Sequence, residues 1–305
     1  MRYTFVKTLT DLAAKNKDIM LLTGDLGFTV FEEFRDKYPK QFFNIGVAEQ
    51  NMIGIAAGLA LSGKIVFAYS IATFASMRAF EHIRDDIASH KAPVIIVGTG
   101  GGLSYAHLSI THHSIEDISL MRSIPEMTIL CPCDPYETAW ATNLAVQMKK
   151  PVYLRLGKKG EPTLHKNKPK LTLGKAHILK EGKDVCILAT GNIVENALEA
   201  ASILSQKKKG AKVVSMHTIK PIDISFIKKA IRQSPYIVTV EEHSIIGGLG
   251  SAVAEVLAEE TGDRRLVRIG IPDTFPSVIG SQQFLRTQFG LDPQSIASKI
   301  LRMLA

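Results

Sequence analysis

The sequence contains few residues of the kinds that cross-link a chain or anchor it in a membrane. Only three of its 305 residues are cysteine, namely Cys131, Cys133 and Cys186, and three thiols cannot all pair. No apolar stretch approaches the roughly 18–20 residues that a membrane helix needs. The first residues also lack the long apolar segment of a secretory signal. These absences argue against a disulfide framework and a membrane-bound protein, and they indicate a reducing, cytoplasmic setting.

The Cys-Pro-Cys segment at 131–133 could be half of a metal site. No second Cys or His pair follows it at the spacing typical of zinc sites. We therefore expect these cysteines to be buried structural thiols, and we assign no metal ligand to this chain.

The charge balance is basic without indicating a nucleic-acid partner. The formal net charge is +8, from 37 Lys and Arg against 29 Asp and Glu. Eight lysines fall between Lys158 and Lys183, and three more form a run at 207–209. Neither region interleaves aromatic residues with the basic ones, as a surface that stacks single-stranded bases would. A solvated linker and a solvated helix end are the simpler interpretation.

Apolar runs alternate with amphipathic segments along most of the chain, which predicts an α/β protein with two doubly wound domains, each with a mostly parallel sheet flanked by helices. Expected strands in the first part are 19–24, 42–45, 64–69, 93–98, 128–131 and 152–156, with helices at 31–38, 49–61, 74–88, 114–121 and 136–148. In the second part we expect strands at 185–190, 212–216, 236–241 and 266–269, with helices at 194–204, 224–231, 249–260 and 293–304. The lysine-rich stretch between the parts reads as a linker, giving domains 1–158 and 184–305 around a linker of 159–183.

Ligands of open α/β sheets bind beyond the carboxyl ends of the strands. This rule directs attention to Gly24-Asp25, Tyr69–Phe74, Gly98–His113 and Arg155–Lys159. The glycine-rich run at 98–102 lacks the spacing and the Lys of a P-loop, so a flexible active-site loop is the better interpretation.

Three places in the sequence that carry acidic or histidine residues have more than one interpretation from the pattern alone. Glu49 begins an otherwise apolar helix, where it could simply complement the helix dipole. His112 and His113 end the glycine-rich loop, where they could be catalytic or merely solvated. Glu242 and His243 follow a strand, where they could form an acid–base pair or a satisfied surface pair.

Several linked segments resemble transketolases. The stretches 44–52 (NIGVAEQNM), 72–80 (ATFASMRAF) and 111–113 (THH) resemble the pyrimidine-binding domain of that family, as do 120–127 and 134–138. The stretch 241–251 (EEHSIIGGLGS) resembles the family's C-terminal domain. The similarity covers nearly the whole chain in the family's order, so the chain resembles the shorter subunit of a split, thiamine-diphosphate-dependent transketolase.

The resemblance implies roles for particular residues. Glu49 matches the acid that hydrogen-bonds N1′ of the cofactor's aminopyrimidine, and Phe74 matches the aromatic residue stacked on that ring. Arg78 and Phe80, in the same matching segment, are further cofactor-contact candidates.

On the substrate side, His112 matches the loop histidine that contacts the substrate carbonyl, so Glu49 and His112 are the expected catalytic residues. His107, Lys158 and Asp25 are the other substrate-binding candidates, with Lys158 expected on the substrate phosphate. Leu108 and Gly100 stand where typical transketolases carry Asp and His, which puts the usual sugar specificity in doubt.

The family's diphosphate- and Mg²⁺-binding motif, Gly-Asp-Gly with a downstream Asn, does not occur in place; here Gly24-Asp25 is followed by Leu26. The resemblance therefore implies a partner, an N-terminal transketolase subunit that carries this motif, joined with this chain in a heterotetramer that acts on sugar phosphates. Two alternatives remain at this stage. One is a beta-type subunit of a 2-oxoacid dehydrogenase or a deoxyxylulose-phosphate-synthase-like enzyme, and the other is a non-catalytic partner subunit.

Overall fold

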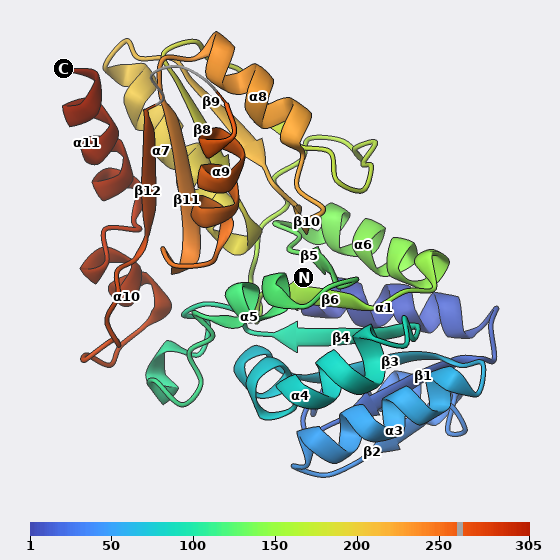
Figure 1. Ribbon diagram of the computed structural model, residues 1–305. Coiled ribbons are helices and arrows are strands. Elements are labelled where there is room, and N and C mark those ends of the chain that lie inside the picture. Colours follow the sequence, from blue (N-terminus) through green and yellow to red (C-terminus); the bar gives the residue numbers. More distant parts are fainter. Residues whose placement is uncertain (261–264) are drawn as a thin grey trace.

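The structure is a computed structural model that describes residues 1–260 and 265–305. Two sheets, each covered by helices on both faces, lie side by side (Figure 1). The two-sheet α/β class predicted from the sequence is confirmed. No helix among the described residues is long and apolar enough to cross a membrane.

The first sheet has seven strands in the order β10-β5-β6-β4-β3-β1-β2, and all neighbours are parallel except β10 with β5. Its central strands are continuous apolar runs because both of their faces are covered. The strands are β1 (Ile19–Thr23), β2 (Phe42–Asn44), β3 (Ile65–Ile71), β4 (Val94–Thr99), β5 (Thr128–Leu130), β6 (Val152–Leu156) and β10 (Thr218–Lys220).

Helices α1 (Arg2–Ala13) and α6 (Pro135–Met148) pack together on one face of this sheet. The other face carries α3 (Glu49–Leu61), α5 (Asp117–Ser123) and a segment in which α4 (Phe80–His82) lies between two π-helical turns, η1 (Phe74–Arg78) and η2 (Ile83–Ala88). Helix α2 (Glu32–Lys37) and the 3₁₀ turn η3 (Ala106–Leu108) complete this part.

The second sheet has the order β12-β11-β8-β9-β7, with β7 antiparallel at its edge. Its strands are β7 (His177–Lys180), β8 (Val185–Ala189), β9 (Ala211–Ser215), β11 (Ile237–Ser244) and β12 (Leu266–Ile271). The helices are η4 (Gly191–Ile193), α7 (Val194–Gln206), α8 (Ile224–Gln233), α9 (Leu249–Ala258), α10 (Gln282–Gln288) and α11 (Pro293–Leu304).

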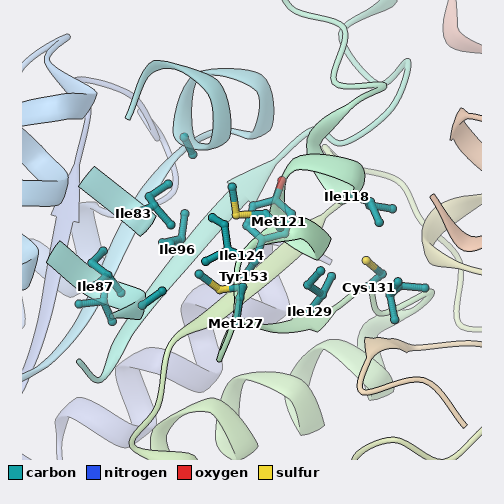
Figure 2. Packing of buried hydrophobic residues seen from close by; sticks show 14 of the residues in the cluster. Ile83, Ile87, Ile96, Ile118, Met121, Ile124, Met127, Ile129, Cys131 and Tyr153 are labelled. Atoms are coloured by element: carbon teal, nitrogen blue, oxygen red, sulfur yellow. The ribbon is translucent and has the colours of Figure 1, made fainter. Parts of the chain in front are cut away.

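One of the three apolar clusters spans both parts. Ile83, Ile96 and Met121 of the first part join a cluster that continues through Ile129 and Cys131 to strands β8 and β9 (Figure 2). Strand β10 also crosses from the second half of the chain to pair with β5. The expected linker 159–183 contains β7, which belongs to the second sheet, while the domain boundaries themselves stay a prediction.

Candidate active site

Glu49 is a buried carboxylate at the first residue of α3. Its side chain is only 1% exposed, and its Oε1 accepts a hydrogen bond from Ser70 Oγ at 2.8 Å. A Cβ added to Gly24 would lie 3.4 Å from the same oxygen, so the end of β1 passes close to the carboxylate. A charge that merely complements the helix dipole would stay in solvent, whereas this one is enclosed by the ends of two strands.

The planar guanidinium of Arg78 connects Glu49 with Phe74. Arg78 Nη1 donates to Glu49 Oε2 at 2.8 Å, and Arg78 Cζ lies 3.7 Å from the centre of the Phe74 ring. Arg78 is 43% exposed, and its guanidinium covers one face of the half-buried Phe74 ring, so a ligand can reach that face only by displacing Arg78. Phe80, two residues further along the chain, instead packs against the core cluster.

His112 lies against Phe74 and belongs to a group of cationic side chains. Its ring centre is 5.0 Å from that of Phe74 in an edge-on arrangement, and its Nδ1 lies 2.9 Å from Thr111 Oγ1. Partial burial lowers the pKa of His112, and the nearby positive charges of Arg78, His107 and Lys158 lower it further. His112 is therefore favoured in its neutral form, which can donate or accept a proton near pH 7.

Lys158 is held over an aromatic ring at the edge of this group. Its Nζ lies 4.4 Å from the centre of the Tyr105 ring, whose centre lies 6.1 Å from that of His112. His107 is exposed on η3, and Leu108 beside it is exposed as well. The arrangement brings the basic side chains of Arg78, His107 and Lys158 near His112 and makes this edge of the sheet attractive to an anion.

Asp25 lies at the same edge of the sheet but belongs to a separate hydrogen-bonded turn. Its Oδ1 accepts from Asn44 Nδ2 at 2.8 Å, and its backbone N–H donates to Asn44 Oδ1 at 3.0 Å. The side chain is exposed at the carboxyl end of β1, so it remains available for a substrate hydroxyl.

The glycine-rich loop after β4 is anchored by close packing. A Cβ at Gly100, where φ is +73°, would meet the Tyr105 ring, and a Cβ at Gly101 would lie 2.7 Å from Arg155 Cζ. A Cβ at Gly102, where φ is +67°, would lie 2.6 Å from Glu242 Oε1. The glycines are therefore needed because the backbone passes close to large side chains, and at two of them because φ is positive.

A buried ion pair between Arg155 and Asp117, which our sequence analysis missed, packs against this loop and stabilises it. Arg155 Nε donates to Asp117 Oδ2 at 2.7 Å, and Tyr153 Oη donates to the same oxygen at 2.6 Å. Burial opposes ionisation of Asp117, but the adjacent Arg155 guanidinium holds the pKa of that carboxyl below its usual value. Arg155 Nη2 also donates to the carbonyl oxygens of Ser114 and Glu242, at 2.9 and 3.1 Å. An Arg inside an apolar strand was the available signal, because such a charge is rarely buried without a partner.

Glu242 and His243 form neither the acid–base pair nor the surface pair that the sequence left open, since both are buried and have separate partners. The Glu242 carboxylate accepts from the backbone N–H of Leu103 at 2.6 Å, from Gln282 Nε2 at 2.7 Å, and from Arg286 Nε. His243 is buried, with Nδ1 2.7 Å from the carbonyl oxygen of Ser244, and burial lowers its pKa to about 4. Residues adjacent in a strand point to opposite faces of the sheet, so the side chains of Glu242 and His243 lie on different faces and have different partners. Likewise only His112 of the histidine pair lies against Phe74; His113 is buried under η3.

Comparisons with known proteins agree with this architecture. A family model described as "Transketolase, pyrimidine binding domain" matches residues 1–161, and one described as "Transketolase, C-terminal domain" matches residues 174–296. An apulose-4-phosphate transketolase subunit of Phocaeicola vulgatus is 39% identical over 99% of this chain and 97% of that protein. The 6-deoxy-6-sulfo-D-fructose transketolase subunit SqwH of Clostridium sp. strain MSTE9 is 39% identical over 97% of this chain and 92% of that protein.

The architecture is also that of a solved structure described as "Split gene transketolase, inactive beta4 tetramer". The TM-score is 0.91 at 39% identity, covering 99% of this chain and 97% of that one. The chain therefore belongs to the transketolase family and is a transketolase-type enzyme subunit, the half that carries the pyrimidine-binding and C-terminal domains.

Proposed function

We propose that this chain provides the pyrimidine-binding side of a thiamine diphosphate site and that, with a partner subunit, it transfers a two-carbon ketol unit between sugar phosphates. The observation that carries the proposal is the enclosed Glu49 carboxylate, linked to the face of the half-buried Phe74 ring by the partly exposed Arg78 guanidinium. Glu49 would share a proton with a nitrogen of the cofactor's pyrimidine ring, and Phe74 would offer a flat apolar surface for that ring to stack on.

The residues present fit such a ring. The Arg78 guanidinium is a planar, nitrogen-bearing cation, and it already makes a stacking contact with Phe74 and an N–H to carboxylate hydrogen bond with Glu49. A site that accommodates this group has the shape and the charge needed for a flat heterocycle with a proton on one nitrogen. We assign Glu49 and Phe74 to direct contact with the ring, with Arg78 moving aside to border it and Phe80 supporting the segment from the core.

Each residue of the site then has a defined task. Thiamine diphosphate, when bound, supplies the thiazolium carbon that attacks the donor ketose and holds its electrons after bond cleavage. Glu49 holds a proton at N1′ of the aminopyrimidine, with Ser70 fixing the other carboxylate oxygen. His112, favoured in its neutral form, moves a proton at the substrate's carbonyl oxygen. Lys158 and His107 bind the anionic end of the sugar, and Asp25 binds a hydroxyl group.

The acceptor substrate we propose is an anionic sugar other than the usual pentose phosphates. Leu108 is exposed beside His107, where typical members carry Asp, so a hydroxyl group loses a polar contact there. Gly100 cannot carry the other usual side chain, a histidine, because a Cβ would meet the Tyr105 ring. The relatives from P. vulgatus and Clostridium are named for apulose 4-phosphate and for a sulfonated fructose, which are both anionic sugars.

We propose that an N-terminal transketolase subunit covers the outer face of α3, within a heterotetramer. Glu49 lies at one end of this helix, Ile55 and Leu61 expose 36% and 61% of their surface along it, and Val47, just before the helix, exposes 69%. Gly54 and Gly58 on the same helix have no atom within 4 Å of an added Cβ, so another backbone can approach closely there. This partner would hold the diphosphate and Mg²⁺. The three free cysteines fit a cytoplasmic protein.

The test is reconstitution with the partner. The purified chain is assayed with thiamine diphosphate and Mg²⁺, with xylulose 5-phosphate and a panel of phosphorylated and sulfonated sugars, alone and with an N-terminal transketolase subunit from the same genome. We expect ketol transfer only from the mixture, and loss of transfer with Glu49→Gln. Turnover by the chain alone would contradict the split site. A mixture whose turnover is unaffected by Glu49→Gln would mean that this chain is a non-catalytic partner.

A further inference from the structure

A second group of functional side chains lies away from the candidate active site, where the linker meets both sheets. Cys133 precedes α6, Glu137 lies in its first turn, and His165 comes from the segment between β6 and β7. One ligand atom from each of the three lies within 4.8 Å of the other two, and all three residues are buried. In Figure 1 this is the region where α6 adjoins strands β5 and β10.

Two atoms in this cluster lack the partners that buried polar atoms normally have. Glu137 Oε1 and His165 Nε2 make no hydrogen bond with any residue that the structure describes, although the side chains are 0% and 3% exposed. The two atoms face each other at 3.6 Å. Such unpaired atoms are rare in folded proteins because each carries a desolvation cost, and an ion bound between them would remove that cost.

The remaining atoms of the same side chains are fixed by hydrogen bonds. His165 Nδ1 lies 2.7 Å from Asp134 Oδ2, which also accepts the backbone N–H groups of Leu164 and His165. The carboxylate therefore assigns the proton to Nδ1 and leaves the lone pair of Nε2 directed into the cluster. Glu137 Oε2 accepts the backbone N–H of Cys133 at 2.8 Å, which leaves Oε1 for the cluster. A carboxylate behind a histidine is a common arrangement at zinc ligands.

We propose that Cys133, Glu137 and His165 bind one divalent ion of the zinc class. Thiolate, imidazole and carboxylate are the ligands that zinc prefers, and bonds of about 2.0–2.3 Å in a tetrahedron place ligand atoms roughly 3.5 Å apart. His165 Nε2 and Glu137 Oε1, 3.6 Å apart, already have this spacing. Cys133 Sγ, within 4.8 Å of both, would reach it by a change of its side-chain torsion angle. Binding releases the thiol proton to solvent and leaves a fourth position, with Ser215 Oγ 3.7 Å from Cys133 Sγ.

The proposal differs from the sequence expectation in two ways. The Cys-Pro-Cys pair does not act together, because Cys131 packs in the apolar core while Cys133 alone joins the cluster. The third ligand is 32 positions further along the chain, which no short motif indicates. The ion would tie the linker to the start of α6, and it would be structural, since it is buried away from Glu49.

The competing explanation is a protonated His165 held between the Asp134 and Glu137 carboxylates without a metal. Titration with cobalt(II) distinguishes the metal site from the protonated histidine, because a thiolate ligand gives bound cobalt(II) a charge-transfer absorption band. The full-length chain is stripped of metal under reducing conditions and titrated with Co²⁺ and then with Zn²⁺, and bound metal is measured by mass spectrometry. The variants are Cys133→Ser, which keeps the shape, and Cys131→Ser, a buried thiol outside the cluster, as the control.

We expect about one ion per chain, a thiolate-to-cobalt band that Zn²⁺ abolishes, and a raised melting temperature with bound metal. The control should keep all three properties, while Cys133→Ser should remain folded by circular dichroism and lose the band. Absence of stoichiometric binding by the reduced wild-type chain would overturn the proposal in favour of the protonated histidine. A band of equal intensity in folded Cys133→Ser would also overturn it.

Discussion

Replacing Glu242 with alanine should weaken the attachment of the glycine-rich loop to the second domain. The Glu242 carboxylate accepts hydrogen bonds from the Leu103 backbone, from Gln282 and from Arg286, and all of it is buried. Its removal leaves the Arg286 guanidinium, which is 8% exposed, with the Asn196 contact at 3.1 Å as its one remaining side-chain hydrogen bond within residues 1–260 and 265–305. Breaking a buried ion pair in this way costs about 3–5 kcal/mol of unfolding free energy.

The assay is chemical unfolding of the purified chain followed by circular dichroism, with Glu255→Ala as the matched control. Glu255 pairs with Arg122, but it is 65% exposed, so its loss should cost at most about 1 kcal/mol. Hydrogen exchange locates the effect. The Leu103 amide loses its acceptor and should exchange faster relative to the amide of Val97 in β4. Equal unfolding free energies for the two variants, or no selective change at Leu103, would refute the reasoning.

Three further predictions concern the substrate, the pH and the loop. Lys158→Ala in the reconstituted enzyme should raise KM for a phosphorylated sugar about tenfold to a hundredfold, while the exposed neighbour variant Lys159→Ala leaves it unchanged. Burial lowers the pKa of His243 from 6.5 to about 4, so the unfolded state takes up a proton first as the pH falls. The free energy of unfolding should therefore fall by roughly 3 kcal/mol between pH 6.5 and pH 4 because of His243. In the His243→Gln variant this part of the pH dependence should be absent from chemical unfolding curves. Gly101→Ala meets Arg155 and should destabilise the chain by about 1–3 kcal/mol, whereas Gly54→Ala, with open space, should be neutral or stabilising in thermal unfolding of the free chain.

The sequence predicted most elements because their patterns are local. Helices 49–61 and 293–304 and strand 152–156 have the expected bounds, and continuous apolar runs marked the other buried strands. The segment 74–88 was expected as one helix, but π-helical turns interrupt it.

The elements we missed are of two kinds. Strand β10 is three residues long and comes from the second half of the chain, where it is stabilised by pairing with β5 of the first sheet, and β7 is a partly exposed edge strand. Such pairings are long-range and leave no local period. Helix α1, in contrast, has apolar residues at helical spacing, with Phe5, Leu9 and Ala13 buried, so that signal was present and overlooked. The helix expected at 114–121 begins instead at Asp117, since Ser114 pairs with Gly102.

In the candidate site, too, some residues could be found from the sequence and others could not. Glu49, Phe74 and His112 came from a resemblance, and the structure brings them into one group with Arg78. The supporting contacts of Glu242 to Leu103 and of Arg155 to Asp117 join residues far apart in the chain. No spacing rule predicts them, because the first depends on how the two sheets meet and the second on how α5 packs against β6.

The central claim is that Glu49 holds the proton at N1′ of the bound cofactor's aminopyrimidine. The most direct measurement is the rate at which the C2 proton of thiamine diphosphate exchanges with deuterium in the reconstituted complex, followed by NMR after acid quench. Glu49→Gln keeps the shape and the hydrogen bond from Ser70 but cannot supply the proton, so exchange should slow by about 10²–10⁴-fold while assembly and cofactor loading stay normal. Exchange at the wild-type rate in a folded, cofactor-loaded variant would contradict the account.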